Sequence, residues 1–518
     1  AFLALFSTGR TQIDPSDPLS SAFRMARRAD LRANLPEGGC ALVFSGGFRA
    51  HSAYGVVPRP FDPDPDFFYL TGLRVPDAVL VIFAAPRTLA EGRVQEVLFL
   101  PDRGDLILRY MGEDFQGKYG YNENGYSIRP ATQWRKFCKE ILAGDSIQKV
   151  LTTPFLTSDY RKRGDLAYID LGSIFYSNMA PGFPFDPPAQ RFYKEIVQAD
   201  TSGLPALINR VTSYLNYFPS VRRDPILDEF SKVDGARALA QVQALVRRIK
   251  IDLVRLPEIL TLMRQTKSGE ELRQLRKSGG IVVNAAKEAA RKAAVGESEA
   301  MVQGVGEFVM RQAGARPAMP SRVASGVRAA LPYYNRNSEK IPDNSLCVVD
   351  FAADLNGYCT RITRTLPGSG TFAARDRDLY KAVKEIHDAT IAQCLPGTRP
   401  SSLVKTTSAG FESIFKDMDI AVNKAGKGKV VKVVSISPIG LDLNELDLPP
   451  MLTPKMVFEV ETAFYIPQSR RIQKAWHHKG IVLRDVVLVT ESGPEVLTKG
   501  FSTSAEAVEA LCKEISRY

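Results

Sequence analysis

The sequence has few histidines, no closely paired cysteines and no long apolar run, and each absence excludes a class of protein. Only four histidines occur in 518 residues, which leaves few imidazole ligands for a metal centre. The six cysteines contain no CxxC pair, so the pattern indicates neither a zinc site nor a disulfide framework and favours a reducing or neutral compartment. No stretch approaches the roughly 20 apolar residues of a membrane helix, so we expect no membrane span.

The composition is that of a globular protein with a basic excess. Apolar residues make up 44% and charged residues 24% of the chain, and its length predicts two or more domains. Lys and Arg number 68 against 57 Asp and Glu, a net charge of +11. This excess permits an anionic partner such as RNA or an acidic protein, and it equally fits an ordinary basic protein.

Three short basic runs are candidates for such a contact. They contain Lys424, Lys427, Lys429 and Lys432; Arg222 and Arg223; and Arg247, Arg248 and Lys250. None has the interleaved aromatic residues that stack on bases. Each could contact RNA or an acidic partner, and each equally fits a solvated surface.

Hydrophobic patterning indicates alternating helices and strands in the first hundred residues. A basic helix is predicted over 24–34, with Pro36 beyond its end. The apolar runs 41–44, 78–83 and 97–100 predict buried strands. Residues 109–190 are rich in Gly, Tyr, Pro and Asn, so we expect a loop-rich segment there.

A long helical stretch is predicted from about 236 to 262, and a second helix comes after it. Ser268 and Glu271 form a capping-box pattern, in which the Ser oxygen caps the helix start and the Glu side chain returns to it. Helical spacing continues from 272 to about 294, and Gly296 is a plausible stop. We therefore place a domain boundary near residue 262.

Five motifs, in order, resemble one known family. Residues 60–72 with 76–81 (PFDPDPDFFYLTG and PDAVLV) are similar to "PFRQDSDFxYLTG…PDAVLVL", and 266–271 (TKSGEE) to the "KSPxEIxxM" helix start. Residues 349–365 (VDFAADLNGYCTRITRT) are similar to "IDxGAExxGYxxDITRT". Residues 454–467 (PKMVFEVETAFYIP) and 480–490 (GIVLRDVVLVT) are similar to "PGMVxTIEPGxYIP" and "GxRIEDDVLVT". The chain thus resembles the aminopeptidase P family of pita-bread metallopeptidases, and its length and character are closest to the mitochondrial branch.

The resemblance implies an α+β fold in two domains. We expect an N-terminal tail over 1–21, a creatinase-type mixed α/β domain over 22–255, and a pita-bread domain over 264–518. Residues 1–13 contain Arg10 and no acid, as is typical of the segment after a cleaved mitochondrial presequence. Together with the family branch, this pattern predicts a location in the mitochondrial matrix.

The family's catalytic site survives only in part. Its enzymes hold two divalent metals with Asp, Asp, His, Glu and Glu, which activate a water and polarise the scissile carbonyl. The residues at these five positions are Asp350, Arg361, Ser437, Glu461 and Arg484. Three ligands are therefore replaced, two of them by guanidinium groups, which cannot ligate a metal. Accordingly, we predict no metal, no cofactor and no catalytic residue.

Two further histidines of the family assist the substrate, and both positions have changed. They correspond to Pro332 and Asn444. The metal-free creatine hydrolases of the same fold depend on the histidine at the first of these positions, so that activity is also not expected.

The retained acids and the new arginines balance in charge. Asp350 and Glu461 supply two negative charges, and Arg361 and Arg484 supply two positive ones. Because an unpaired buried carboxylate costs several kcal/mol, we expect both arginines to point into the old metal cavity. At least one should form an ion pair with Asp350 or Glu461.

These observations favour a pseudoenzyme. The first hypothesis is a structural subunit or assembly factor of a larger mitochondrial complex, ribosomal or respiratory, whose partners are other protein subunits. A homodimer is possible, as in many family enzymes. The alternatives are a nuclear-type protein-binding module on the same fold, and an active Xaa-Pro aminopeptidase with a rebuilt site.

Overall fold

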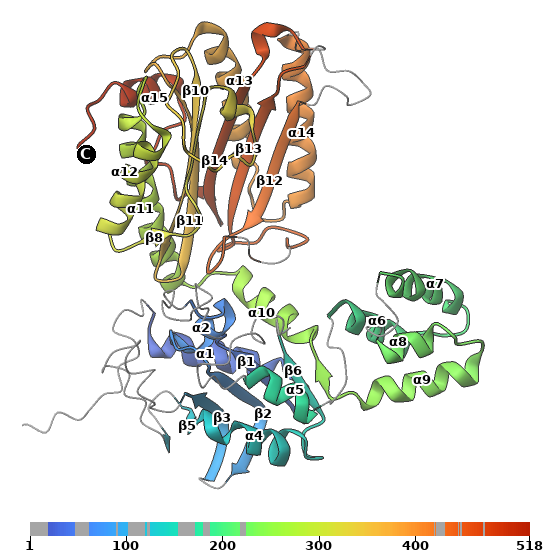
Figure 1. The fold of residues 1–518 in the computed structure, drawn as a ribbon. Coiled ribbons are helices and arrows are strands. Elements are labelled where there is room, and N and C mark those ends of the chain that lie inside the picture. The colour runs from blue at the N-terminus through green and yellow to red at the C-terminus, as the bar shows by residue number, and fades with distance from the viewer. Residues whose placement is uncertain are drawn as a thin grey trace, which may run out of the picture. The chain divides into compact units, whose positions relative to one another are not determined.

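The computed structural model describes residues 19–46, 62–89, 92–101, 120–121, 125–153, 171–179, 187–217, 224–418, 420, 430–443, 445, 448–469 and 472–518. The chain divides into two compact units between Met263 and Arg264 (Figure 1). The first unit holds a mixed seven-stranded sheet and the second an antiparallel eight-stranded sheet, each with helices. The predicted α+β class is therefore confirmed.

The first unit is built around the mixed sheet, whose strand order is β4-β5-β3-β2-β1-β6-β7. Its strands are β1 (Gly39–Phe44), β2 (Val79–Leu89), β3 (Gly92–Leu100), β4 (Gly120–Tyr121), β5 (Ser127–Pro130), β6 (Lys149–Thr152) and β7 (Ile251–Asp252). Its helices outside residues 187–248 are α1 (Ser21–Ala33), α2 (Pro65–Thr71), α4 (Trp134–Phe137), α5 (Leu171–Met179) and α10 (Arg255–Gln265), whose last two residues belong to the second unit. Short helical turns lie at η1 (Ala131–Gln133) and η2 (Cys138–Leu142), the second of them a π-helical turn. The predicted strands at 41–44, 78–83 and 97–100 are confirmed, because each falls within β1, β2 or β3 with at most one residue of difference.

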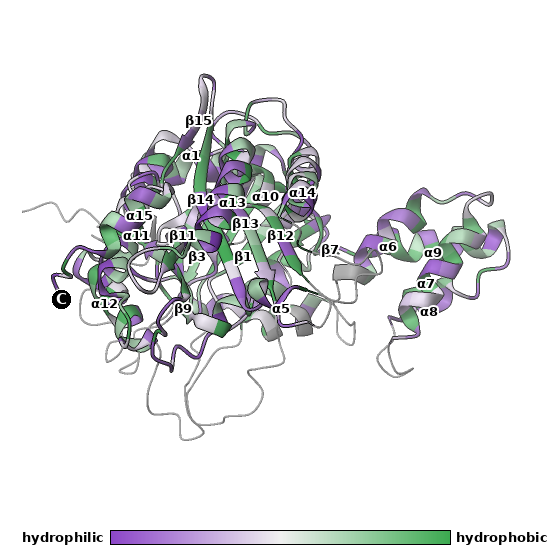
Figure 2. Cartoon of the chain, turned by 90° about the horizontal axis from the view of Figure 1, so that it is seen from above, coloured by the Kyte–Doolittle hydropathy of each residue, from purple (hydrophilic) through white to green (hydrophobic). Residues whose placement is uncertain are grey.

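Four helices in this unit share a hydrophobic core of their own. They are α6 (Pro187–Gln198), α7 (Leu204–Leu215), α8 (Pro225–Phe230) and α9 (Ala236–Arg248). Buried residues from all four form one cluster, which contains none of the buried side chains of the core that includes β1, β2 and β3. Figure 2 shows these helices with both hydrophilic and hydrophobic residues, as amphipathic helices require. We refer to residues 187–248 as the four-helix module.

Two sequence-based expectations for this unit were wrong. The single helix predicted from 236 to 262 is two helices, α9 and α10, separated by strand β7. Ile249 leaves the helical conformation with ψ 118°, and the Asp252 carboxylate then forms a turn before α10 by accepting from the backbone N–H groups of Val254 and Arg255. The segment 109–190 is not loop-rich in the part that the structure describes (120–121, 125–153, 171–179 and 187–190), since β5, α4, β6 and α5 lie there.

The second unit is an antiparallel sheet with the strand order β12-β13-β14-β11-β10-β8, in which β15 also pairs with β14 and β9 with β10. Its strands are β8 (Arg316–Pro317), β9 (Arg322–Ser325), β10 (Leu346–Leu355), β11 (Tyr358–Pro367), β12 (Val431–Pro438), β13 (Val457–Ile466), β14 (Lys479–Thr490) and β15 (Gly493–Val496). Its helices are α11 (Gly269–Lys292), α12 (Glu299–Gln312), α13 (Ala374–Ala392), α14 (Pro400–Asp417) and α15 (Ala505–Cys512), with short turns at η4 (Gly326–Ala330) and η5 (Lys474–Trp476).

Helix α11 begins as the capping-box pattern predicted. The Ser268 hydroxyl accepts from the N–H of Glu271, and the Glu271 carboxylate accepts from the N–H of Ser268. The helix ends at Lys292, two residues before the expected end, and Gly296 lies in the loop beyond it with φ +82°. Within the described residues, no helix is long and apolar enough to cross a membrane.

Candidate functional site

The candidate site is formed by side chains on the central strands of the second sheet. Asp350 lies on β10 opposite Thr363 of β11, and Arg361 lies opposite Ala352, two residues along β10 from Asp350. Since side chains two residues apart share a face, Asp350 and Arg361 are diagonal neighbours. The Asp350 carboxylate accepts from Arg361 Nε at 2.9 Å and Nη2 at 2.6 Å, and from the Thr363 hydroxyl at 2.9 Å.

The second ion pair joins the next two strands. Glu461 on β13 is directly opposite Arg484 on β14, and the Arg484 Nη2 contacts the Glu461 carboxylate. Arg484 Nη1 also lies 3.6 Å from the Asp350 Oδ1. The expected pairing is confirmed, because both arginines face the retained acids and each forms an ion pair with at least one of them.

A third carboxylate, Glu459, belongs to the same cluster and was missed from the sequence. Its Oε1 lies 3.8 Å from Arg361 Nη1 and 3.8 Å from Arg484 Nε. Glu459 is two residues before Glu461 on β13, so the strand period could have revealed it. The family pattern "TIEP" has a threonine at this position.

A third arginine, Arg322 on β9, was also missed. It is the register partner of Asp350 across the β9–β10 pair and its charge lowers the pKa of that carboxyl. Its Nη1 donates to the carbonyl of Pro332. No local pattern marks Arg322, because its position depends on pairing between strands far apart in the sequence. The cluster is therefore three acids and three arginines, and the expected balance of two against two was incomplete.

The other predicted positions contribute less to the charged cluster. Ser437 on β12 lies opposite Glu459, and its hydroxyl shares a hydrogen bond of 2.9 Å with Ser435. Pro332 contributes its backbone carbonyl to Arg322. Asn444 lies outside the residues that the structure describes.

Burial and charge act in opposite directions on the acids of this cluster. Burial raises the pKa of the Asp350 carboxyl, but the charges of Arg361 and Arg484 outweigh it and hold that pKa well below its usual range. The pKa of Glu459 is raised, because burial outweighs the same two arginines at their longer distances. One Glu459 oxygen is buried without a hydrogen-bond partner. Asp350 is thus kept ionised, whereas Glu459 is protonated more readily.

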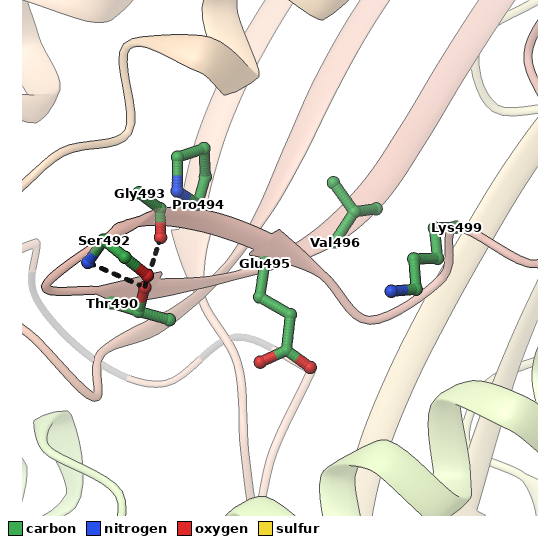
Figure 3. A pocket seen from close by; sticks show the side chains of 7 residues that line it. All are labelled: Thr490, Ser492, Gly493, Pro494, Glu495, Val496 and Lys499. Carbon is green, nitrogen blue, oxygen red and sulfur yellow. Dashed lines mark hydrogen bonds between the residues drawn. The ribbon is translucent and has the colours of Figure 1, made fainter.

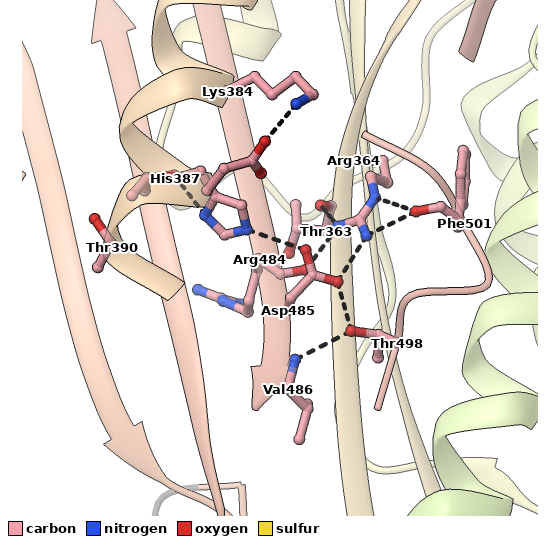
Figure 4. Close-up of polar contacts among 12 residues, drawn as sticks. Thr363, Arg364, Lys384, His387, Thr390, Arg484, Asp485, Val486, Thr498 and Phe501 are labelled. Carbon is pink, nitrogen blue, oxygen red and sulfur yellow. Dashed lines mark hydrogen bonds and ion pairs between the residues drawn. The ribbon is translucent and has the colours of Figure 1, made fainter. Parts of the chain in front are cut away.

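A fully hydrogen-bonded network lies beside Arg484 on β14 (Figure 4). The buried Asp485 carboxylate accepts from Arg364 Nη2 at 2.7 Å and from the Thr498 hydroxyl, and lies 3.0 Å from His387 Nε2. His387 Nδ1 in turn lies 2.9 Å from the Thr462 hydroxyl. Because every group in this network has a partner, it fixes β14 and thereby the position of Arg484.

No metal-binding group of three or more His, Cys, Asp or Glu side chains is found among the described residues. An open pocket lies elsewhere, at the β14–β15 hairpin (Figure 3). It is lined by Thr490, Ser492, Gly493, Pro494, Glu495, Val496 and Lys499. Its one carboxylate, Glu495, is bound by Arg276 through two hydrogen bonds, so the pocket offers no uncommitted acid.

Two family models match the chain, in the order that the motifs indicate. The aminopeptidase P N-terminal domain matches residues 25–151, and metallopeptidase family M24 matches residues 273–491. Neither match covers residues 152–272, where the four-helix module lies.

Several curated proteins are similar to this chain over about half of its length. The Xaa-Pro aminopeptidase of Escherichia coli (strain K12) is 29% identical over 48% of this chain and 59% of that protein. The Xaa-Pro aminopeptidase 3 of Mus musculus is 28% identical over 50% and 53%. The mitochondrial intermediate cleaving peptidase 55 of Arabidopsis thaliana is 28% identical over 48% and 51%. The chain thus spans between half and six-tenths of these relatives.

The solved structures extend the similarity to nearly the whole fold. The structure of Escherichia coli aminopeptidase P with the inhibitor Pro-Leu has a TM-score of 0.71 and covers 95% of this chain and 98% of that one, at 21% identity. This likeness confirms the predicted creatinase-type N-terminal domain followed by a pita-bread domain. With both matched domains in the expected order on that fold, the chain belongs to metallopeptidase family M24, in its aminopeptidase P branch.

Proposed function

We propose that this chain is a non-catalytic member of the aminopeptidase P branch and acts as a structural subunit or assembly factor of a larger complex in the mitochondrial matrix. One observation carries the proposal. Arg361 and Arg484, at two positions where the family has metal-binding acids, are bound to the two retained acids Asp350 and Glu461.

The donor set at these positions does not fit two divalent cations. A metal at Asp350 would have to displace the Arg361 guanidinium from its two hydrogen bonds and remain close to that positive charge. A protonated guanidinium has no lone pair to offer, and its pKa is too high for it to lose its proton. The side chain that replaces the metal-binding histidine is the hydroxyl of Ser437, which is hydrogen-bonded to Ser435. These side chains therefore do not provide the donors that a two-metal hydrolase needs.

Two observations support the location and the role in a complex. The similar Arabidopsis protein carries "mitochondrial" in its name, and the net charge of +11 suits an anionic partner or neighbour. Ion pairs take the place of the catalytic metal ligands, and the pita-bread domain remains folded. The protein therefore retains the outer surfaces of that domain. Surfaces are what a structural subunit contributes to a complex.

The loss of catalysis predicts no cleavage of Xaa-Pro peptides by the purified protein, with or without added Mn²⁺, Co²⁺ or Zn²⁺. Equilibrium dialysis should likewise find no stoichiometric metal. The matched variant Arg361→Asp/Ser437→His/Arg484→Glu restores the family donors, and we expect it to bind metal where the parent chain does not. Turnover by the parent protein that Asp350→Ala abolishes would contradict the proposal.

The structural role predicts a large particle in native extracts. In a density gradient of mitochondrial extract at physiological salt, we expect most of the protein to sediment with a larger assembly. A catalytic aminopeptidase P added to the same gradient marks the position of the free enzyme. Recovery of the protein only at the size of a free monomer or dimer would exclude a subunit role.

A further inference from the structure

We infer that one end of the four-helix module binds the phosphate backbone of double-helical RNA. The binding surface is formed by Arg191 and Lys194 on α6 with Arg247 and Arg248 on α9, which we call the basic end. It lies in the first unit, in a segment that neither family model matches. The inference goes beyond the proposed function and is independent of whether catalysis is lost.

Hydrogen bonds fix the two helices side by side in opposite directions. Near the start of α6, the Gln190 amide donates to the carbonyl of Ile251 and accepts from the N–H of Leu253. Near its end, the carbonyls of Ile196 and Ala199 both accept from the Gln243 amide of α9, each at 3.0 Å. The first turns of α6 therefore run beside the last turn of α9, which brings the two pairs of cations to the same end.

The four cations are exposed and lack acidic partners. Arg191, Lys194, Arg247 and Arg248 are all exposed. None of them has an ion pair within the described part of the chain, and α9 contains no acidic residue. The buried residues of α9 (Leu239, Val242 and Val246) face the module core, so the two arginines in its last turn are not needed for packing.

Several charges elsewhere in the module are already bound by partners. Arg210 pairs with Glu195, and Lys232 pairs with Asp228. Asp224 is buried, where it caps α8 and accepts from the Tyr193 hydroxyl, and Asp200 accepts from the N–H groups that precede α7. Among the described residues, four of the five cations without an ion pair on α6 and α9 therefore lie at the basic end, and the fifth, Arg237, lies in the first turn of α9 at the opposite end.

The chemistry of the basic end suits a phosphate backbone better than an acidic protein. Three of its four cations are arginines, whose forked donors match phosphate oxygens in pairs. Protein interfaces take most of their energy from buried apolar anchors. On the described parts of α6 and α9, the only exposed large apolar side chain is Leu245, which is 37% exposed. No aromatic side chain is exposed there to stack on single-stranded bases. Duplex RNA is recognised by shape and by its phosphates and 2′-hydroxyls across a wide, shallow minor groove, which two adjacent helices can meet without entering it.

The test is binding of the full-length protein to a fluorescent RNA duplex longer than about 16 base pairs, followed by anisotropy at several salt concentrations. Arg247→Gln/Arg248→Gln should weaken binding about tenfold or more and lower the slope of log K against log salt by about 2. Adding Arg191→Gln/Lys194→Gln should abolish it. Arg210→Gln/Lys232→Gln removes the same charge from the same module, but at residues already paired with acids, and should leave affinity nearly unchanged.

Three outcomes would overturn the inference. The first is an equal loss of RNA affinity in the basic-end and control variants, which would show that only the net charge of the protein matters. The second is equal affinity for a DNA duplex of the same sequence, which would remove the RNA assignment. The third is binding of a polyglutamate probe in preference to the duplex, which would identify an acidic protein as the partner. None of these depends on the peptidase assay, so this inference and the proposed function can fail separately.

Discussion

Replacing Arg484 by alanine is expected to lower the free energy of unfolding by about 3–5 kcal/mol. Arg484 is 6% exposed and lies within 4 Å of three buried or nearly buried carboxylates, those of Asp350, Glu459 and Glu461. Removing the guanidinium leaves the largely buried Glu461 without its ion-pair partner, and it leaves Asp350 and Glu459 with Arg361 as their remaining partner. The measurement is the thermal or denaturant midpoint of the second unit.

The matched control is Arg276→Ala. Arg276 donates to both oxygens of Glu495, in the same two-bond pattern that joins Arg361 to Asp350. The side chains of Arg276 and Glu495 are 46% and 34% exposed, however, and an ion pair open to solvent contributes at most about 1 kcal/mol. If the two variants lose similar stability, Arg484 is not acting as a buried counter-ion.

The loss of unfolding free energy caused by Arg484→Ala should become smaller as the pH falls. Without Arg484, the pKa of Glu459, which burial already raises, rises further. A carboxyl whose folded pKa exceeds its unfolded value contributes most below the unfolded pKa, about 4.3 for Glu, and that contribution is lost as the pH rises through the folded pKa. The variant should therefore be closest to the parent protein in mild acid. A deficit independent of pH would indicate lost packing and not unpaired charge.

The residues of the site that could be predicted from the sequence lie within family motifs, at fixed positions on their strands. Asp350 and Arg361 are linked by a short hairpin, and Glu461 and Arg484 each lie in a motif whose register on adjacent strands places them opposite each other. Glu459 could have been included by the two-residue period of a strand. Arg322 could not, because only the β9–β10 pairing brings it to Asp350.

The fold shows the same division between local and long-range information. The Ser268–Glu271 capping box was predictable because both partners lie within one turn. The break between α9 and α10 was missed, because the stretch reads as helix locally while Ile251 pairs with Val150 as a strand of the first sheet. The four-helix module was missed for a related reason, since its core combines residues from four short helices.

The second large effect concerns Gly480, at the start of β14. A Cβ atom on this residue would lie 1.8 Å from the carbonyl oxygen of Ala329 and 2.4 Å from its carbon. Backbone atoms cannot yield as a flexible side chain would. We therefore expect Gly480→Ala to displace η4 from β14 and to lower the free energy of unfolding by more than about 3 kcal/mol.

The displacement should also reach the charged cluster. Ala329 belongs to η4, which leads to Pro332, and the Pro332 carbonyl accepts from Arg322, the register partner of Asp350. Gly280 in α11 is the control, because a Cβ there meets nothing within 4 Å, and Gly280→Ala should stabilise the helix by about 1 kcal/mol. The substitution Arg322→Ala should lower the free energy of unfolding less in the Gly480→Ala background than in the parent protein. The reason is that Gly480→Ala already disturbs the contact between Arg322 and Pro332. Full additivity of the two changes would show that η4 does not hold Arg322 in place.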